Sequence, residues 1–381
     1  MAQLSVAAPH AETGEALALA HSLPAPGPAP GRYWKIDVAK LGLEELAPGS
    51  SEPSFQIDDS ARRLGVVACD LREAQAHAAA AAQNTVVDWR RGKLTALNAA
   101  HRSGGAFIFL PEGAVLDEPI VVHHRLRGPA AFPYTLVAAS PGSRATVISH
   151  FEAGEDVSLV SEVVEIVAAE RAALTFAAVQ QLPTTARVFW ARHGNVQRDA
   201  ELHWAIADFG AGLSIGEVRS TTLDPGARTT IAGFFFPSAN QHVDVKAEAD
   251  HPAAQTQSET LFKSAASGHG QARFIGNIRI HPAAHGVDAT LRDDALLLSK
   301  HAHIDSIPAL EIGANDVKAY HGAAIGAIDD EELFYAMTRG IDREDAERMI
   351  ALGFFEPAIV RFPTDGLRVA LRGALSEKVA K

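Results

Sequence analysis

The sequence predicts a mainly β protein, in which a stacked solenoid of strands lies between helical regions at the two ends of the chain. From about 106 to 316, short apolar runs of strand length are separated by turn residues, with no helical pattern between them. Within these runs the apolar residues recur with a period of two, whereas the flanking segments show helical spacing. We therefore expect a mostly helical region with a proline-rich linker over residues 1–100, a β core over 101–328 and a helical domain over 329–381.

The first hundred residues carry helix signals separated by an extended linker. Residues 11–23 suggest a short helix, and "PAPGPAPG" at 24–31 predicts an extended segment, because repeated proline fixes φ and removes hydrogen-bond donors. Helices are expected again in "LREAQAHAAAAAQ", after Asp70, and in "GKLTALNAAHRSGG", where Gly104 and Gly105 supply a stop.

Alternation within single runs indicates which side chains face inward. In "RFIGNIRI", Phe274, Gly276 and Ile278 share one face of a strand, while Arg273 and Asn277 share the other. So many strands without intervening helices fit a sandwich, a barrel or a parallel β-helix. Over two hundred residues of strand and turn fit the stacked solenoid best, although no fixed repeat length is visible.

Composition and charge narrow the class of protein. The chain has 381 residues, 47% of them hydrophobic, and a net charge of −12, which disfavours binding to nucleic acid or to an anionic membrane. No Lys or Arg precedes Arg32, and no apolar run is long enough for a membrane span. The single cysteine, Cys69, excludes an internal disulfide and a site made of cysteines alone, so we expect a reducing cytoplasm. Its helical, alanine-rich surroundings suggest a small buried apolar residue.

Helical spacing returns after residue 327. Asp329 or Asp330 can cap a helix that Gly340 ends, and Asp342 can cap a second one. Apolar residues of the second helix recur at helical spacing, at Ala346, Met349, Ile350 and Phe354. Such helices could cover the end of a solenoid, or their apolar residues could meet another protein.

The stretch "SIPALEIGANDVKAYHGAAIGAIDDEELFYAMTRGIDREDAERMI" resembles the C-terminal signature of the SufB and SufD scaffold proteins of the SUF system. That signature has a "P-x-L-E-I-x-A-x-D-V-K-x-x-H-G-A" run before "D-x-E-x-x-F-Y-x-x-x-R-G-I". The segments "LTALNAAHRSGGAFIFLPEGAVLDEPIVV", "GRYWKIDVAKL" and "QHVDVKAEADHPAAQTQSETLFKSAASGHGQARFIGNIRI" are also similar to family patterns. The resemblance covers most of residues 30 to 360.

The resemblance implies a right-handed parallel β-helix and a non-catalytic role in iron-sulfur cluster assembly. SufB-like chains are typically longer and carry a cysteine late in the β-helix, which this chain lacks, so SufD is the closer match. The family then implies pairing with a SufB-like subunit through the β-helix and with the ATPase SufC through the C-terminal helices. No G-x-x-x-x-G-K-[ST] motif occurs, so any ATP-driven step is expected to belong to that partner.

His321 is the candidate metal ligand. It matches the histidine that the SufD family is thought to contribute at the interface with SufB, and a neutral imidazole is a good iron ligand. One histidine cannot hold a cluster, so the other ligands must come from elsewhere. The alternative is a structural histidine, hydrogen-bonded where strand gives way to helix. For contacts with the partners we expect Phe334, Tyr335, Arg339, Met349, Ile350 and Phe354.

Two histidine pairs suggest weaker metal sites. His301 and His303 could face one way on a strand, and His281 with His285 could chelate an ion on a helix. Seventeen histidines make such pairs expected by chance, so solvent-facing side chains are the simpler interpretation.

Two polar motifs keep other functions open. "GLSIG" around Ser214 matches a nucleophile elbow, but no helix pattern follows, which favours a β-turn. Arg292, Asp293 and Asp294 could suit a β-helix carbohydrate-active enzyme, or could simply form a polar turn. A homodimeric β-helix that binds without a metal role is the third alternative.

Overall fold

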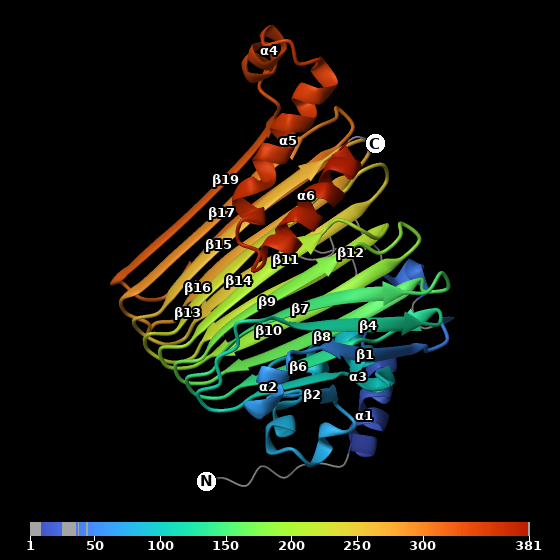
Figure 1. Ribbon diagram of the computed structural model, residues 1–381, viewed down its shortest axis with the longest axis vertical. Coiled ribbons are helices and arrows are strands. Elements are labelled where there is room, and N and C mark those ends of the chain that lie inside the picture. Colours follow the sequence, from blue (N-terminus) through green and yellow to red (C-terminus); the bar gives the residue numbers. More distant parts are fainter. Residues whose placement is uncertain (1–8, 25–35, 37, 43–44, 380–381) are drawn as a thin grey trace.

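The central chain winds as a parallel β-helix, as the sequence predicts. The computed structural model describes residues 9–24, 36, 38–42 and 45–379. From β6 onward, successive strands fall alternately into a ten-stranded and a nine-stranded sheet, and the two sheets enclose the lumen of the helix (Figure 1). Neighbouring strands are parallel throughout, except that β1 runs antiparallel to β4 and β2 to β3. No helix in this described part of the chain is long and apolar enough to cross a membrane.

The strands follow one another across each sheet in steps of one turn of the helix. The nine-stranded sheet contains, in order, β1 (Ser50–Gln56), β4 (Ile120–Arg127), β7 (Arg144–Ala153), β9 (Ala173–Gln180), β11 (Glu201–Asp208), β13 (Arg228–Phe235), β15 (Gln257–Ala266), β17 (Val287–Leu297) and β19 (Val317–Ala327). The ten-stranded sheet contains β18 (His303–Ile312), β16 (Gln271–Ile280), β14 (His242–His251), β12 (Leu213–Thr222), β10 (Arg187–Val196), β8 (Leu159–Ala168), β6 (Tyr134–Ala139), β3 (Ala106–Leu110) and β2 (Val67–Asp70), with β5 (Ala130–Ala131) beside β8.

One corner of the β-helix is set by single residues in the left-handed region. Successive turns place there Arg171, Asp199, Gly226, Gln255 and Gly286, with φ between 54° and 80°. Their amides donate to the next turn, as in the bond from Gly226 N to Gln255 O at 3.0 Å. A Cβ at Gly226 would lie 1.9 Å from Asp199 Oδ1, so glycine is favoured there, whereas other turns carry side chains at this corner.

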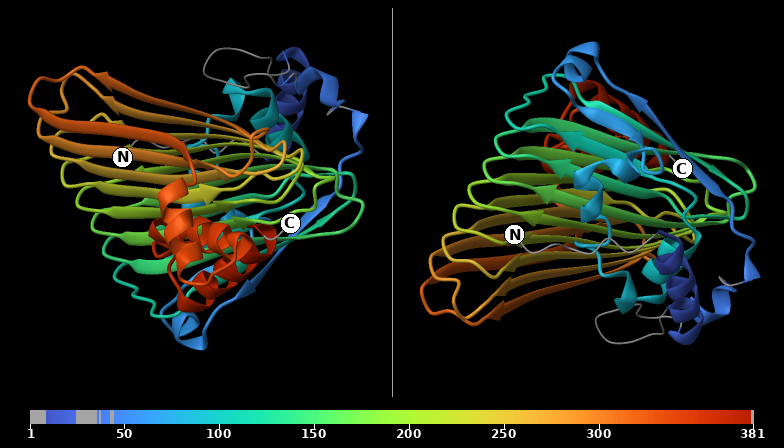
Figure 2. Two further views of the ribbon diagram at one scale, coloured as in Figure 1. Left: turned by 90° about the horizontal axis from the view of Figure 1, so that it is seen from above. Right: turned by 90° about the horizontal axis from the view of Figure 1, so that it is seen from below.

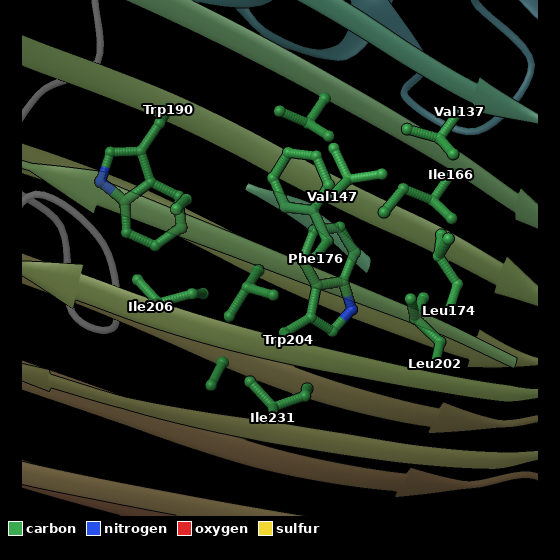
Figure 3. Packing of buried hydrophobic residues seen from close by; sticks show 14 of the residues in the cluster. Val137, Val147, Ile166, Leu174, Phe176, Trp190, Leu202, Trp204, Ile206 and Ile231 are labelled. Atoms are coloured by element: carbon green, nitrogen blue, oxygen red, sulfur yellow. The ribbon is translucent and has the colours of Figure 1, made fainter. Parts of the chain in front are cut away.

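Apolar and aromatic side chains fill the lumen. Phe176 and Trp204 meet edge to face at 5.5 Å between ring centroids, and Trp204 Nε1 donates to Ser220 Oγ at 2.8 Å (Figure 3). The inward face predicted for "RFIGNIRI" is confirmed, because Phe274 and Ile278 belong to this lumen core. Parallel strands covered on both faces explain why the apolar runs are nearly continuous.

The C-terminal helices lie on the outside of the nine-stranded sheet. They are α4 (Asp330–Thr338), α5 (Arg343–Ile359) and α6 (Asp365–Val379). Phe355 and Phe362 pack on Phe234 of β13, with ring centroids 5.4 and 5.8 Å apart (Figure 1). The prediction that these helices cap the end of the solenoid is therefore wrong for α5 and α6. They pack on the outer face of this sheet, which is itself apolar.

The capping residues predicted for these helices are confirmed. The Asp329 carboxylate accepts from Glu331 N at 2.7 Å, and that of Asp342 accepts from Asp345 N at 2.9 Å. Gly340, with φ of 88°, follows α4.

Helices of the N-terminal region cover the opposite, ten-stranded sheet. The helices that do so are α1 (Pro9–Ser22) and α3 (Lys93–His101), whereas Ala61 of the short helix α2 (Asp59–Arg63) belongs to the lumen core. Ala16, Ala20 and Leu97 join an apolar cluster with Phe189 and Ile215 on the outer face of that sheet. Figure 2 shows the dark-blue α1 with the teal α3 and the red C-terminal helices on opposite sides of the two sheets. Most of the proline-rich linker and the "GRYWK" part of the family segment lie outside the described residues.

Two N-terminal predictions are wrong. "LREAQAHAAAAAQ" forms two short 3-10 helices, Ala74–Ala76 and Ala78–Ala82, rather than an α-helix. Between them His77 is extended, its ring packs 4.4 Å from that of Phe109, and its Nδ1 accepts from Ala79 N at 3.2 Å. Alanines offer no apolar stripe to oppose this tertiary contact. Cys69 lies on strand β2, half-buried, and not in a helix.

Two buried histidines make folding stability depend on pH. Burial lowers the pKa of His124 and of His251 to about 4. Both are neutral in the folded and unfolded chain above pH 6.5, whereas below it only the unfolded chain takes up the protons. The free energy of unfolding therefore falls as the pH falls from 6.5 towards 4. At pH 5 each is expected to lower the free energy of unfolding by about 2 kcal/mol.

Replacing His251 by glutamine tests this expectation. The amide can still donate to and accept from the hydroxyls that His251 contacts, on Thr222, Thr256 and Ser258. Urea unfolding at pH 7.5 and 5.0 should show a loss on acidification that is smaller in H251Q than in the unchanged protein. The exposed H285Q should keep the full loss. An equal loss in H251Q would contradict the assignment.

Candidate functional site

The last turn of the β-helix is open. β18 and β19 are the terminal strands of their sheets, and within the residues that the structure describes each is paired with a strand of its sheet along one side only. Such an edge presents a row of backbone donors and acceptors that can pair with another chain. Four large apolar side chains of these two strands are also exposed: Ile307, Ile312, Tyr320 and Ile325. We call this surface, formed by β18 and β19, the open end.

His321 lies on β19, within the open end. Its backbone partner on β17 is Leu291, a lumen residue, so His321 lies on the lumen-facing side of its strand. The residue is exposed, because no further turn covers it. Within the described part of the chain its ring has no hydrogen-bond partner. The structural role, a histidine hydrogen-bonded at the junction, therefore has no contact to support it.

A complete metal site is not formed by this chain alone. Among the described residues, no three His, Cys, Asp or Glu side chains are grouped so that they could hold a metal ion. A metal at His321 would therefore need ligands from a second molecule or from the solvent.

Asp293 is a group near the open end whose position the sequence interpretation placed wrongly. The sequence predicts a polar turn at Arg292, Asp293 and Asp294. This is wrong, because the three residues lie inside strand β17. Asp293 faces the lumen and is completely buried, and neither carboxylate oxygen has a hydrogen-bond partner among the described residues. Burial raises its pKa to about 7, the Ser306 hydroxyl opposing this effect. The signal was present in the sequence, since Val287, Ala289 and Leu291 alternate inward on the same strand.

Asp294 points the other way, towards the C-terminal helices. Its carboxylate accepts from Lys263 Nζ at 2.7 Å and from Arg292 Nε at 2.9 Å. The same ammonium lies 4.7 Å from the centroid of the Phe354 ring on α5. A chain of direct contacts therefore runs from α5 to the strand that carries Asp293.

The predicted partner-binding residues fall into two groups. Phe334 and Tyr335 on α4 are 68% and 61% exposed, and Met349 on α5 is also exposed. The Arg339 guanidinium lies 5.0 Å from the Tyr335 ring centroid and donates to its hydroxyl at 2.9 Å. By contrast, Ile350 and Phe354 are partly buried against clusters of the chain itself, which gives them a packing role.

The other candidate sites are occupied by structural contacts. The β-turn predicted at Ser214 is wrong, because the residue lies on strand β12. Its hydroxyl donates to Asp208 at 2.5 Å inside the lumen. His281 Nε2 lies 2.8 Å from Asp250 Oδ1, in a stretch without helix. His301 is exposed and stacks on His269, and His303 pairs with Asp305 at 2.9 Å.

Comparison with known proteins agrees with this architecture. Residues 122–354 match the sequence profile of the family described as SUF system FeS cluster assembly, SufBD core domain. The chain belongs to the SufBD family. A protein of Staphylococcus epidermidis, named iron-sulfur cluster assembly SufBD family protein, is 28% identical over 285 residues, covering 74% of this chain and 61% of the relative. A SufBD protein of Staphylococcus saprophyticus is 28% identical over 286 residues, covering 74% of this chain and 62% of the relative.

The match spans about three-fifths of the length of these SufBD relatives. It confirms the resemblance to the SufB and SufD family. Closeness to SufD in particular stays a prediction, as do the roles of individual residues.

Proposed function

We propose that this SufBD protein is a non-catalytic, SufD-like scaffold subunit of a cytoplasmic SUF complex. Its open end pairs with a SufB-like subunit, and its α4–α5 surface binds a SufC-like ATPase. The nascent iron-sulfur cluster is the cargo of this complex and is held in passing between the two β-helices. His321 supplies one ligand from this chain.

The observation that carries the proposal is the exposed imidazole on an unpaired strand edge. A second β-helix that continues the sheets past β18 and β19 would hydrogen-bond to their free edges and cover Tyr320 and Ile325. His321 would then lie inside a joined lumen, shielded from water and beside the partner's side chains. An imidazole can replace a thiolate on one side of a cluster.

Contacts on the other side connect this site to the helices. ATPase subunits that move α5 would also move Phe354 and, through Lys263, the Asp294 carboxylate on β17. β17 pairs directly with β19, in register from Val287↔Val317 onward. The arrangement offers a short mechanical route from a nucleotide-driven partner to the strand of His321.

Replacing His321 by alanine tests the proposed function. The assembled complex with H321A should form at the normal yield but lose most of its iron and acid-labile sulfide after reconstitution, because a ligand is removed without disturbing a packed core. H285A, which removes another exposed histidine, should retain both. Normal iron and sulfide content in H321A would remove the ligand role.

A second copy of this chain also fits the open end, because the edges of β18 and β19 accept any compatible strand. The isolated chain is therefore expected to form a homodimer when the SufB-like subunit is absent. If the purified chain stayed monomeric at micromolar concentration while binding a SufB-like subunit, the edge would be selective for that partner.

A further inference from the structure

Asp293 combines complete burial with two unpartnered oxygens. Buried carboxylates without hydrogen bonds are rare because desolvation strongly disfavours the charge. In this part of the lumen an apolar residue would pack without that penalty. Packing alone therefore does not explain a carboxylate at this position, whereas binding a ligand would.

The neighbours of Asp293 in the lumen are bulky on one side and small on the other. In register with Asp293 lie Phe262 on β15 and Ala323 on β19. The rings of Phe262 and Phe274 pack at 4.7 Å and fill the lumen one turn further in. On the open side only the Ala323 methyl group follows, the smallest side chain with a Cβ. The hydroxyl of Ser306, on β18, lies close enough to Asp293 to lower the pKa of its carboxyl, although neither group makes a hydrogen bond of standard geometry among the described residues.

His321 lies on the same face of the neighbouring strand, β19. Its partner Leu291 is two residues before Asp293 on β17, so both side chains lie on the lumen side of adjacent strands. Strand spacing and rise place their Cα atoms about 8 Å apart. Metal–ligand bonds of about 2 Å then allow one ion to bridge an imidazole and a carboxylate extended towards each other.

We propose that Asp293 and His321 bind one ferrous ion together at the open end, so that this chain supplies two ligands to the nascent cluster. The proposal deepens the proposed function and rests on it. Ferrous iron accepts mixed imidazole and carboxylate ligands, as in non-haem iron sites. Water or groups of the second subunit complete the coordination. Asp294 does not compete, because it faces outward and is bound by Lys263 and Arg292.

Anaerobic equilibrium dialysis of Fe²⁺ against the isolated full-length chain tests the pair without any cluster chemistry. The variants are D293N, which is isosteric, H321Q and the double variant, with H303Q as the control for an exposed His–Asp pair. Each single variant is expected to weaken Fe²⁺ binding at least ten-fold, and the double variant to be much less than additive, because one ion is shared. H303Q should bind as the unchanged chain does. Circular dichroism verifies the fold of each variant.

Three results would overturn the inference. Unchanged Fe²⁺ affinity in D293N would leave Asp293 a purely structural residue. Weaker Fe²⁺ binding in D293N but not in H321Q would place the ion away from His321. Fully additive losses of Fe²⁺ affinity in the double variant would indicate two separate ions. The proposed function is judged separately, by cluster content of the assembled complex. If H321A lost the cluster while D293N kept it, the scaffold role would stand and the two-ligand site would not.

Discussion

Replacing Arg192 by methionine is expected to lower the free energy of unfolding by about 3–5 kcal/mol, although the residue is remote from every functional surface. Arg192 lies in the lumen, where its Nε donates to Glu162 Oε2 at 2.8 Å. The two side chains are only 2% and 1% exposed. The guanidinium also stacks 4.3 Å from the Trp190 ring centroid. Removing it leaves a carboxylate inside the protein without a counter-charge.

The direction of the pKa shifts agrees with this expectation. Burial raises the pKa of Glu162 and of Asp208, and the positive charge of Arg192 opposes the rise at both groups. Without Arg192 both carboxyls would shift further towards the neutral form. Asp208 keeps hydrogen bonds from Gln180, Trp190 and Ser214, whereas Glu162 would keep none from a side chain.

Chemical denaturation of two further variants completes the test. The double variant E162L/R192M removes both charges and is expected to recover most of the loss, because paired apolar substitutes avoid the desolvation penalty. R228M breaks an exposed pair between adjacent turns, Arg228 with Glu201, and should lower stability by less than about 1 kcal/mol. A loss in R192M no larger than that in R228M would show that the lumen pair is solvated and not buried.

The sequence predicts the β-helix because the alternation of apolar and polar residues reveals its strands. The length of the repeat is not visible in the sequence. Ion pairs between neighbouring turns span 27 residues for Arg228–Glu201, 29 for Arg273–Asp244 and 31 for Lys263–Asp294. Corner loops absorb these differences. Left-handed corner positions are filled by glycine in some turns and by residues such as Arg171 or Asp199 in others. No single residue type therefore marks the period.

Polar residues inside strands account for the errors at the site. The Arg292–Asp294 run predicts a turn because polar clusters usually interrupt strands, and Ser214 predicts one because no helix pattern follows it. In a β-helix, lumen side chains can pair across the interior, as Ser214 does with Asp208, so polarity does not end the strand. His321 was found only through the family resemblance, since a lone histidine has no distinctive spacing. The placement of α5 and α6 depended on an apolar outer face that alternation alone does not reveal.

Replacing both Phe334 and Tyr335 by alanine is expected to weaken binding of the SufC-like ATPase by more than about a hundred-fold. Aromatic side chains dominate interface energetics when they insert into a partner, and these two are the most exposed large apolar residues of α4. Arg339 holds the Tyr335 ring by stacking and a hydrogen bond, so little ordering remains to be done on binding. α4 itself stands away from the body of the protein (Figure 1).

Deleting the helical domain would not make the same point. Its removal would expose Phe234 and the rest of the apolar outer face, so loss of binding could follow from misfolding. The double alanine variant leaves Leu333 and Ala336, the buried side of α4, in place. V369A, at a 66% exposed valine of α6, is the matched control and should bind normally. Isothermal titration of the ATPase into each variant measures the difference, and normal affinity in the double variant would move the ATPase contact away from α4.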